Sequence, residues 1–169
     1  MKSTENSYYS SFVISGIKFD IFSSRKGIKK IYINNKSSQQ YTKEVTKLQP
    51  DDPFMFNVFT ELKEYFNGQR SNFSVPLDIA GTIFQQKVWN ELLKIPFGKT
   101  VSYKKVAIGI GNVKAVRAVG RANGANPVPI IIPCHRVIAN DGKLGGYSCG
   151  IKIKEKLLEL EGCLSLELF

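Results

Sequence analysis

The sequence predicts an α+β fold in two parts: a small antiparallel sheet with one helix in residues 1–80, then a mainly helical part in residues 81–169. Three observations carry this prediction. Short runs rich in β-branched and aromatic residues come first, an apolar pattern at helical spacing follows, and glycine and proline divide the second part into short helices. The 169 residues are 43% apolar and 11% aromatic, enough to bury a core, which excludes a disordered chain.

The first part is expected to form a meander covered by a helix. Its three short strands are separated by glycine-containing turns and occupy residues 11–15, 18–23 and 28–33. Asp52 followed by Pro53 is typical of a helix start, and apolar residues then recur at helical spacing as far as Asn67. No cluster of reactive side chains occurs here, so a structural role is expected for this part.

The second part is expected to contain several short capped helices. Thr82 and Gln85 fit a capping box at the start of the first, and Ser102 is placed to cap the second. Asn112 is expected to cap a third helix, residues 113–122, after a turn that contains two glycines. A helix, a glycine-containing turn and a helix in this order indicate a helix-turn-helix.

Positive charge is concentrated in the second part. The chain has 24 Lys and Arg against 14 Asp and Glu, a net charge of +10, and residues 87–154 supply all of it with twelve basic and two acidic side chains. A solvated basic face is the ordinary alternative. Lys114, Arg117 and Arg121, however, share one face of the third predicted helix, beside small residues that allow close approach to a groove. This pattern favours DNA binding.

The sequence contains few residues that could bind a metal, form disulfides or span a membrane. It has one histidine, His135, and three cysteines, Cys134, Cys149 and Cys163. Zinc needs about three or four such ligands, so no metal or other cofactor is expected, and the odd cysteine count argues against a disulfide framework. No run approaches the roughly 20 apolar residues of a membrane span, and the N-terminus is polar. The protein is therefore expected to be cytoplasmic, or nuclear in a eukaryote.

Residues 126–137, NPVPIIIPCHRV, place Cys134 after a proline-restricted apolar run that should be buried and rigid. A cysteine that merely fills the core is disfavoured, because His135 and Arg136 would be costly companions inside it. The thiolate is the nucleophilic form, and a histidine can serve as its base through a water, since adjacent side chains diverge. Three later carboxylates are candidates to orient the imidazole: Glu155, Glu159 and Glu161.

Short motifs then follow one another in order from Gly81 to Gly162, over roughly half the chain. They are Phe97–Gly98, Val101–Ser102–Tyr103, Ala115–Gly120, Asn126–Pro127, Pro133–Cys134–His135–Arg136–Val137, Gly145–Gly146–Tyr147–Ser148, Leu157–Leu158 and Glu161–Gly162. Together they closely resemble the O6-alkylguanine-DNA alkyltransferases. The resemblance implies an RNase H-like first part, a winged-helix-like helix-turn-helix that enters the minor groove, a flipped guanine, and irreversible alkyl transfer to cysteine, so that each molecule acts once.

The same resemblance implies catalytic roles. Cys134 would attack the alkyl carbon, His135 would be its water-mediated base, and Glu161 would orient His135. Asn126 would brace the turn, and Tyr103 would hydrogen-bond or protonate the departing guanine. Taken singly, these last three residues could instead be a solvated helix-end carboxylate, an ordinary turn residue and a core aromatic.

DNA contacts and a base pocket are implied as well. Arg117 would occupy the gap that the flipped base leaves in the duplex. Further expected DNA contacts are Lys104, Asn112, Lys114, Arg121, Arg136 and Asn140. The expected lining of the alkylguanine pocket is Pro129, Gly145, Tyr147, Ser148 and Cys149. Cys149 stands where the family usually has a small residue, and is expected to narrow the space for bulky alkyl groups.

Two other functions remain open. One is a non-enzymatic sensor of alkylated bases, which the retained Cys134 disfavours. The other is a helix-turn-helix regulator, disfavoured because the third predicted helix offers no Asn or Gln before Asn123 to read base edges. The expected partner is double-stranded DNA containing O6-alkylguanine, with O4-alkylthymine as a second possible substrate, and the protein is expected to be a monomer. Because residues 1–80 contain neither Cys nor His, the zinc site of some relatives is not expected.

Overall fold

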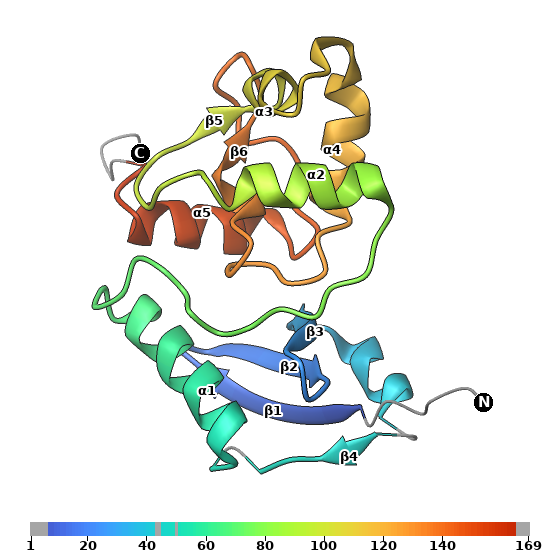
Figure 1. Cartoon of the computed structure of the whole chain (residues 1–169). Coiled ribbons are helices and arrows are strands. Elements are labelled where there is room, and N and C mark those ends of the chain that lie inside the picture. Colours follow the sequence, from blue (N-terminus) through green and yellow to red (C-terminus); the bar gives the residue numbers. More distant parts are fainter. Residues whose placement is uncertain (1–6, 43–44, 50, 165–169) are drawn as a thin grey trace, which may run out of the picture. The chain divides into compact units, whose positions relative to one another are not determined.

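The computed structural model describes residues 7–42, 45–49 and 51–164, and the chain divides into two compact units, Met1–Ile79 and Ala80–Phe169 (Figure 1). The boundary predicted from the sequence, after residue 80, lies one residue beyond the boundary between these two units. Within the described ranges, none of the helices combines the length and the apolar character that a membrane span requires.

The first unit contains a four-stranded mixed sheet. Its strands are β1 (Tyr8–Ile14), β2 (Ile17–Ser23), β3 (Ile28–Ile33) and β4 (Thr46–Lys47), in the order β3-β2-β1-β4. The predicted meander is confirmed, since β1–β2 and β2–β3 are antiparallel. The prediction of a wholly antiparallel sheet is wrong, because β4 pairs in parallel with β1 after a crossover through a 3-10 helix, Lys36–Tyr41.

One helix, α1 (Pro53–Phe66), covers one face of this sheet (Figure 1). It begins as predicted, because the Asp52 carboxylate accepts hydrogen bonds from the backbone of Phe54 and Met55 at 3.1 and 3.4 Å. Its apolar stripe is fully buried and consists of Met55, Val58, Leu62 and Tyr65. Burial of this stripe against the alternating apolar residues of the strands forms the core of the first unit.

The second unit is mainly helical, as predicted. Its elements are α2 (Ile83–Leu92), β5 (Val101–Ser102), α3 (Tyr103–Gly109), a 3-10 turn η2 (Val113–Ala115), α4 (Val116–Gly124), a 3-10 turn η3 (Cys134–Arg136), β6 (Val137–Ile138) and α5 (Ile151–Leu160). Trp89 of α2 is buried and donates its indole N–H to the carbonyl of Ala122 in α4 at 2.9 Å. This contact locks the first helix of the unit to the helix that carries the basic face.

In the second unit, two of the three predicted caps are confirmed. Thr82 and Gln85 form the capping box of α2, and the Ser102 hydroxyl accepts from the backbone N–H of Lys105 at 3.2 Å to cap α3. The cap predicted at Asn112 is wrong: within the described chain its side chain makes no capping bond. The chain instead winds through the 3-10 turn η2, so α4 starts only after Ala115.

Candidate functional site

Cys134 follows a buried and strained turn. Val128, Ile130 and Ile132 are fully buried, and the N–H of Ile132 bonds the carbonyl of Val128 at 2.9 Å. Ile130 has a φ of +76°, a region that β-branched residues avoid. Such a conformation persists only where the surrounding packing fixes it, and it occurs preferentially at functional sites. The Cys134 side chain, on the 3-10 turn η3, is therefore rigidly placed, and the residue is only 1% exposed.

The Asn126 side chain ties this turn together. Its amide nitrogen donates to the carbonyl of Ile132 at 2.8 Å and to the sulfur of Cys134 at 2.9 Å. Its amide oxygen accepts from the backbone N–H of Val128 at 3.0 Å. One side chain thus connects the start of the turn, its end and the thiol.

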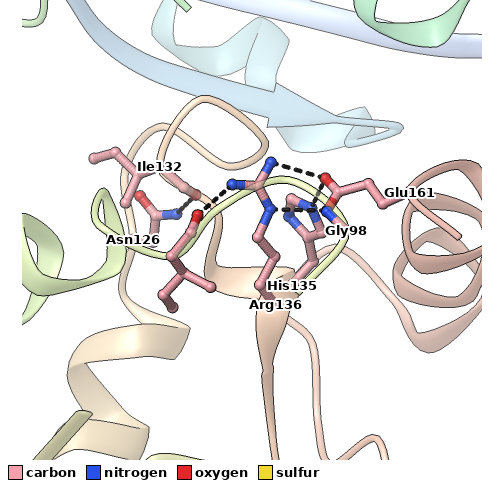
Figure 2. Close-up of polar contacts among 7 residues, drawn as sticks. Gly98, Asn126, Ile132, His135, Arg136 and Glu161 are labelled. Carbon is pink, nitrogen blue, oxygen red and sulfur yellow. Dashed lines mark hydrogen bonds and ion pairs between the residues drawn. The ribbon is translucent and has the colours of Figure 1, made fainter. Parts of the chain in front are cut away.

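Glu161, the residue that ends α5, meets both His135 and Arg136. Its Oε1 lies 2.8 Å from His135 Nε2, while Arg136 donates from Nε to Oε2 at 2.8 Å and from Nη2 to Oε1 at 2.9 Å (Figure 2). The Gly98 backbone N–H adds a bond to Oε2 at 3.2 Å, and Arg136 Nη1 donates to the carbonyl of Ile95 at 2.6 Å. Of the three candidate carboxylates, Glu161 is the one that the fold brings to the histidine.

The burial of these residues bears on two predictions. His135 is 0% exposed and Arg136 only 5%, so the expectation that they would be too costly to bury beside Cys134 is wrong. The shared carboxylate of Glu161 offsets the cost, because each charged or polar group in the cluster has a partner. Arg136 is buried for the same reason, and its interior bonds to Glu161 and Ile95 argue against the predicted contact with DNA.

Burial also sets the protonation states. It raises the pKa of the Cys134 thiol to about 12, although hydrogen bonds from Asn126 and Tyr147 act in the opposite direction. Burial lowers the pKa of His135, against the opposing effect of the Glu161 carboxylate. The pKa of Tyr103 is raised, again mainly by burial. At neutral pH the thiol and the phenol therefore keep their protons, and the imidazole is neutral and able to accept one.

A cavity of about 340 Å³ opens beside the start of α3. It is lined by Tyr103, Gly120, Asn123, Gly124, Gly146, Tyr147 and Ser148. Glycine suits position 145 because its φ is +69°, and an added Cβ there would lie 3.4 Å from the Tyr103 hydroxyl, an ordinary contact distance. The structure thus brings Tyr103, Tyr147 and Ser148 together, whereas Pro129, Gly145 and Cys149 are not among the described residues that line this cavity.

The remaining predicted DNA contacts lie on the surface. The exposed ones are Lys104, Asn112, Lys114, Arg117, Arg121 and Asn140. Arg117 and Arg121 belong to α4, the helix that also supplies Gly120, Asn123 and Gly124 to the cavity. A basic surface and a concave pocket therefore share one helix.

Sequence reasoning missed two residues of the site. Asn123 follows the third predicted helix and is not among the predicted site residues, but it lines the cavity and its side-chain amide donates to the carbonyl of Cys134 at 3.3 Å. Lys154 was counted only as a charge, yet it is fully buried. Its position three and four residues before Leu157 and Leu158, on the apolar stripe of α5, is the signal that would have revealed it.

Among the described residues, no group of three or more His, Cys, Asp or Glu side chains is arranged to hold a metal ion.

The chain is similar to known proteins over nearly its whole length. It is 41% identical over 167 residues to the inducible methylated-DNA--protein-cysteine methyltransferase of Bacillus subtilis, which covers 95% of this chain and 93% of that protein. It is 50% identical over 123 residues to the methylated-DNA--protein-cysteine methyltransferase of Mycobacterium tuberculosis, covering 73% and 74%.

Solved structures agree with these sequence matches. A crystal structure of the Mycobacterium tuberculosis O6-methylguanine methyltransferase has a TM-score of 0.82 and 36% identity over 96% of each chain. The Mycobacterium tuberculosis OGT in complex with DNA has a TM-score of 0.81 and 39% identity over 92% of this chain and 93% of that one.

Family models account for both units. The ribonuclease-like domain of 6-O-methylguanine DNA methyltransferase matches residues 8–79, which confirms the RNase H-like fold expected for the first unit. The DNA binding domain of the same family matches residues 83–163, the stretch that contains the cysteine turn, the basic helix and the cavity. The chain therefore belongs to the O6-methylguanine DNA methyltransferase family.

Proposed function

We propose that this protein repairs DNA by moving the alkyl group of an O6-alkylguanine irreversibly onto the sulfur of its own Cys134. The observation that carries the proposal is that one buried turn holds both Cys134, hydrogen-bonded to Asn126, and the next residue, His135, paired with Glu161. A cysteine that only fills space has no need of a buried histidine–carboxylate pair beside it. The names of the relatives and the DNA complex of a structural neighbour support the same activity.

The protonation states define the first step. The Cys134 thiol, whose pKa is about 12, must lose its proton before it can attack. His135 takes that proton through a water, and the Glu161 carboxylate 2.8 Å from Nε2 stabilises the resulting imidazolium. The sulfur then forms a bond to the alkyl carbon as the bond from that carbon to O6 breaks.

The leaving group is guanine, which gains the electron pair of the broken bond and needs a proton. Tyr103 lines the cavity, and its raised pKa keeps its hydroxyl protonated, so it can donate to the departing base. Overall the thiol proton ends on guanine. The product is a thioether, which has no easy return path, and each molecule of protein is consumed by one transfer.

Access to Cys134 requires the target base to leave the duplex. The thiol is almost completely buried, and a base in a helical stack cannot reach it. The cavity beside Tyr103 is large enough to hold an extruded guanine, and Arg117 on the exposed face of α4 would occupy the vacated position in the duplex. Lys104, Asn112, Lys114, Arg121 and Asn140 would contact the backbone without reading sequence. All of these groups come from one chain, so a monomer is sufficient.

Intact-protein mass spectrometry tests the proposal. After incubation with a duplex oligonucleotide containing O6-methylguanine, we expect the mass of the protein to rise by one methyl group, mapped to Cys134 by peptide analysis. Cys134→Ala should abolish the change, whereas the control Cys163→Ala should retain it. Tight binding without a change of mass would instead favour the alkylated-base sensor.

A further inference from the structure

The side chain of Lys154 is the most unusual buried group outside the proposed reaction path. It lies in α5, is 0% exposed, and shares the apolar stripe of that helix with Leu157 and Leu158. An ammonium group is costly to bury unless it is hydrogen-bonded. Lys154 Nζ donates to the carbonyl of Val137 at 2.6 Å and also to the carbonyl of Leu144.

These two carbonyls belong to the two segments that form the proposed site. Val137, in β6, directly follows the turn that holds Cys134 and His135. Leu144 directly precedes the loop that carries Gly146, Tyr147 and Ser148 to the cavity. One ammonium group therefore joins the thiol-bearing turn to the pocket loop.

We propose that Lys154 is a positioning residue for the acceptor cysteine: its buried ammonium group ties the pocket loop to β6, and its positive charge favours the thiolate of Cys134. The inference rests on the proposed function for its biological meaning, but it concerns a property of the thiol that is measurable without DNA. Both effects come from the same ammonium group: it donates hydrogen bonds to the two carbonyls, and its charge acts on the sulfur.

The electrostatic part follows from the surroundings of Lys154. Burial lowers the pKa of Lys154 to about 8, and the negative charge of a Cys134 thiolate acts to raise it. An interaction between two charges is mutual, so the ammonium stabilises the thiolate to the same extent. The charge of Lys154 also helps to lower the pKa of His135, which keeps the imidazole in its neutral, proton-accepting form.

Several other titratable or charged groups act on Cys134 and His135 together with Lys154. The turn η3 contributes the titratable Cys134 and His135 and the charged Arg136, the pocket loop contributes Tyr147 and Cys149, and the end of α5 contributes Glu161. Arg136 has its charge neutralised by Glu161 at 2.8 Å. Lys154 is bonded instead to two neutral carbonyls, so its charge is left to act on the thiolate.

The pH dependence of thiol reactivity distinguishes this role from simple support. While Lys154 is charged, the thiolate fraction rises about tenfold for each pH unit, as for any thiol far below its pKa. Above about pH 8 the dominant form has a neutral amine and a protonated thiol. The form with a neutral Lys154 and a protonated Cys134 holds the same number of protons as the form with a charged Lys154 and a Cys134 thiolate. The ratio of these two forms therefore does not change with pH. The reactivity of Cys134 should therefore level off above about pH 8.

The experiment measures the rate at which iodoacetamide alkylates Cys134 in the full-length protein, followed by peptide mass spectrometry across this pH range. The wild type should level off near pH 8. Lys154→Met should react at least about tenfold more slowly at pH 7 and should rise with pH without levelling. Lys154→Arg, which keeps its charge, should react faster than Lys154→Met at pH 7 and should also not level off. Lys152→Met, an exposed neighbour on the same helix, should match the wild type.

Two results would overturn the inference: a wild-type rate that continues to rise tenfold per pH unit through pH 8, or equal rates for Lys154→Met and Lys152→Met at pH 7. The wild-type profile decides the question even if Lys154→Met does not fold. Because iodoacetamide reacts without DNA, a levelled profile together with no methyl transfer from O6-methylguanine would count against the proposed function and not against the role of Lys154.

Discussion

The Glu161 carboxylate holds the His135 ring by a 2.8 Å contact between Oε1 and Nε2, and both side chains are fully excluded from solvent. A carboxylate in this position can fix the tautomer and orientation of an imidazole and stabilise its charged form. The same carboxylate also neutralises Arg136. Its removal therefore affects both the chemistry and the stability of the second unit.

Glu161→Gln should destabilise the protein and slow the transfer. An amide cannot neutralise Arg136, and leaving a buried charge without its partner costs about 3–5 kcal/mol. We expect the free energy of unfolding in urea to fall by that amount, and methyl transfer in single-turnover assays to slow by at least about tenfold. Glu159→Gln removes an exposed carboxylate two residues earlier and is the matched control. Equal stability of the two variants would contradict the central role given to Glu161.

Acid should destabilise the protein through His135. The pKa of His135 is lowered in the folded state by burial, so below about pH 6.5 the unfolded chain binds a proton that the folded chain does not. The stability that comes from the neutral ring is therefore present above that pH and is lost as the pH falls. His135 is the only histidine of the chain, so His135→Gln should remove this component from unfolding curves measured between about pH 5 and 7. An unchanged pH dependence would mean that His135 titrates normally in the folded protein.

Asn126→Ala should loosen the cysteine turn. The change removes the bonds to Ile132, Val128 and Cys134 and takes away the partner of the buried Val128 N–H, at a cost of about 1–3 kcal/mol. It also removes a hydrogen bond that lowers the pKa of the thiol. Reduced stability and slower alkylation of Cys134 are expected together. Asn90→Ala, on the exposed face of α2, should change neither.

Local signals in the sequence were enough to predict the helices. Caps act over three residues, so the Thr82–Gln85 box and the Ser102 cap could be identified from spacing alone. The pairings of β4 with β1 and of β5 with β6 span two residues each, too few to leave a periodic pattern. The delayed start of α4 could not be predicted either, because the 3-10 turn before it depends on how the chain packs after Gly111.

The buried charges show why the site was only partly predictable. Arg136 and Glu161 are 25 residues apart in the sequence, and in the described part of the chain Lys154 pairs with no carboxylate but is bonded to two backbone carbonyls. Such partners leave no trace in composition or spacing. The sequence therefore supported Cys134 and His135 through the proline-restricted run and the motif that contain them, whereas the interior location of Arg136 and the bonding partners of Lys154 required the tertiary structure.

Arg117→Ala should impair repair of duplex DNA far more than reaction with a free alkylated base. Arg117 is exposed on α4 and makes its proposed contribution only when a base has left a duplex, a step that costs a few kcal/mol. We expect transfer from a duplex to slow by at least about tenfold, while the reaction with free O6-benzylguanine stays within about twofold of the wild type. Lys87→Ala, an exposed basic residue of α2, is the control. Equal losses on both substrates would place Arg117 in the chemical step instead.

Binding to undamaged DNA should depend steeply on salt. Each phosphate contact contributes about −0.9 to the slope of log affinity against log salt concentration. Lys114→Ala and Arg121→Ala should each reduce the slope by about 1 and weaken binding equally on unrelated sequences. Fluorescence anisotropy with labelled duplexes at several salt concentrations measures both quantities. Arg136→Lys should leave the slope unchanged, because Arg136 is buried.

Cys149→Gly should favour bulky alkyl groups. Cys149 is half-buried and directly follows Ser148, which lines the cavity, so its side chain belongs to the loop that borders the pocket. Removing a group of about methyl size or more from a pocket changes selectivity by roughly tenfold. We therefore expect the ratio of benzyl to methyl transfer rates to rise by up to about tenfold, with Cys149→Ala giving an intermediate value. Cys163→Ala should leave the ratio unchanged. If Cys149→Gly also leaves this ratio unchanged, other residues set the space around the alkyl group, and the family difference at this position has no bearing on substrate size.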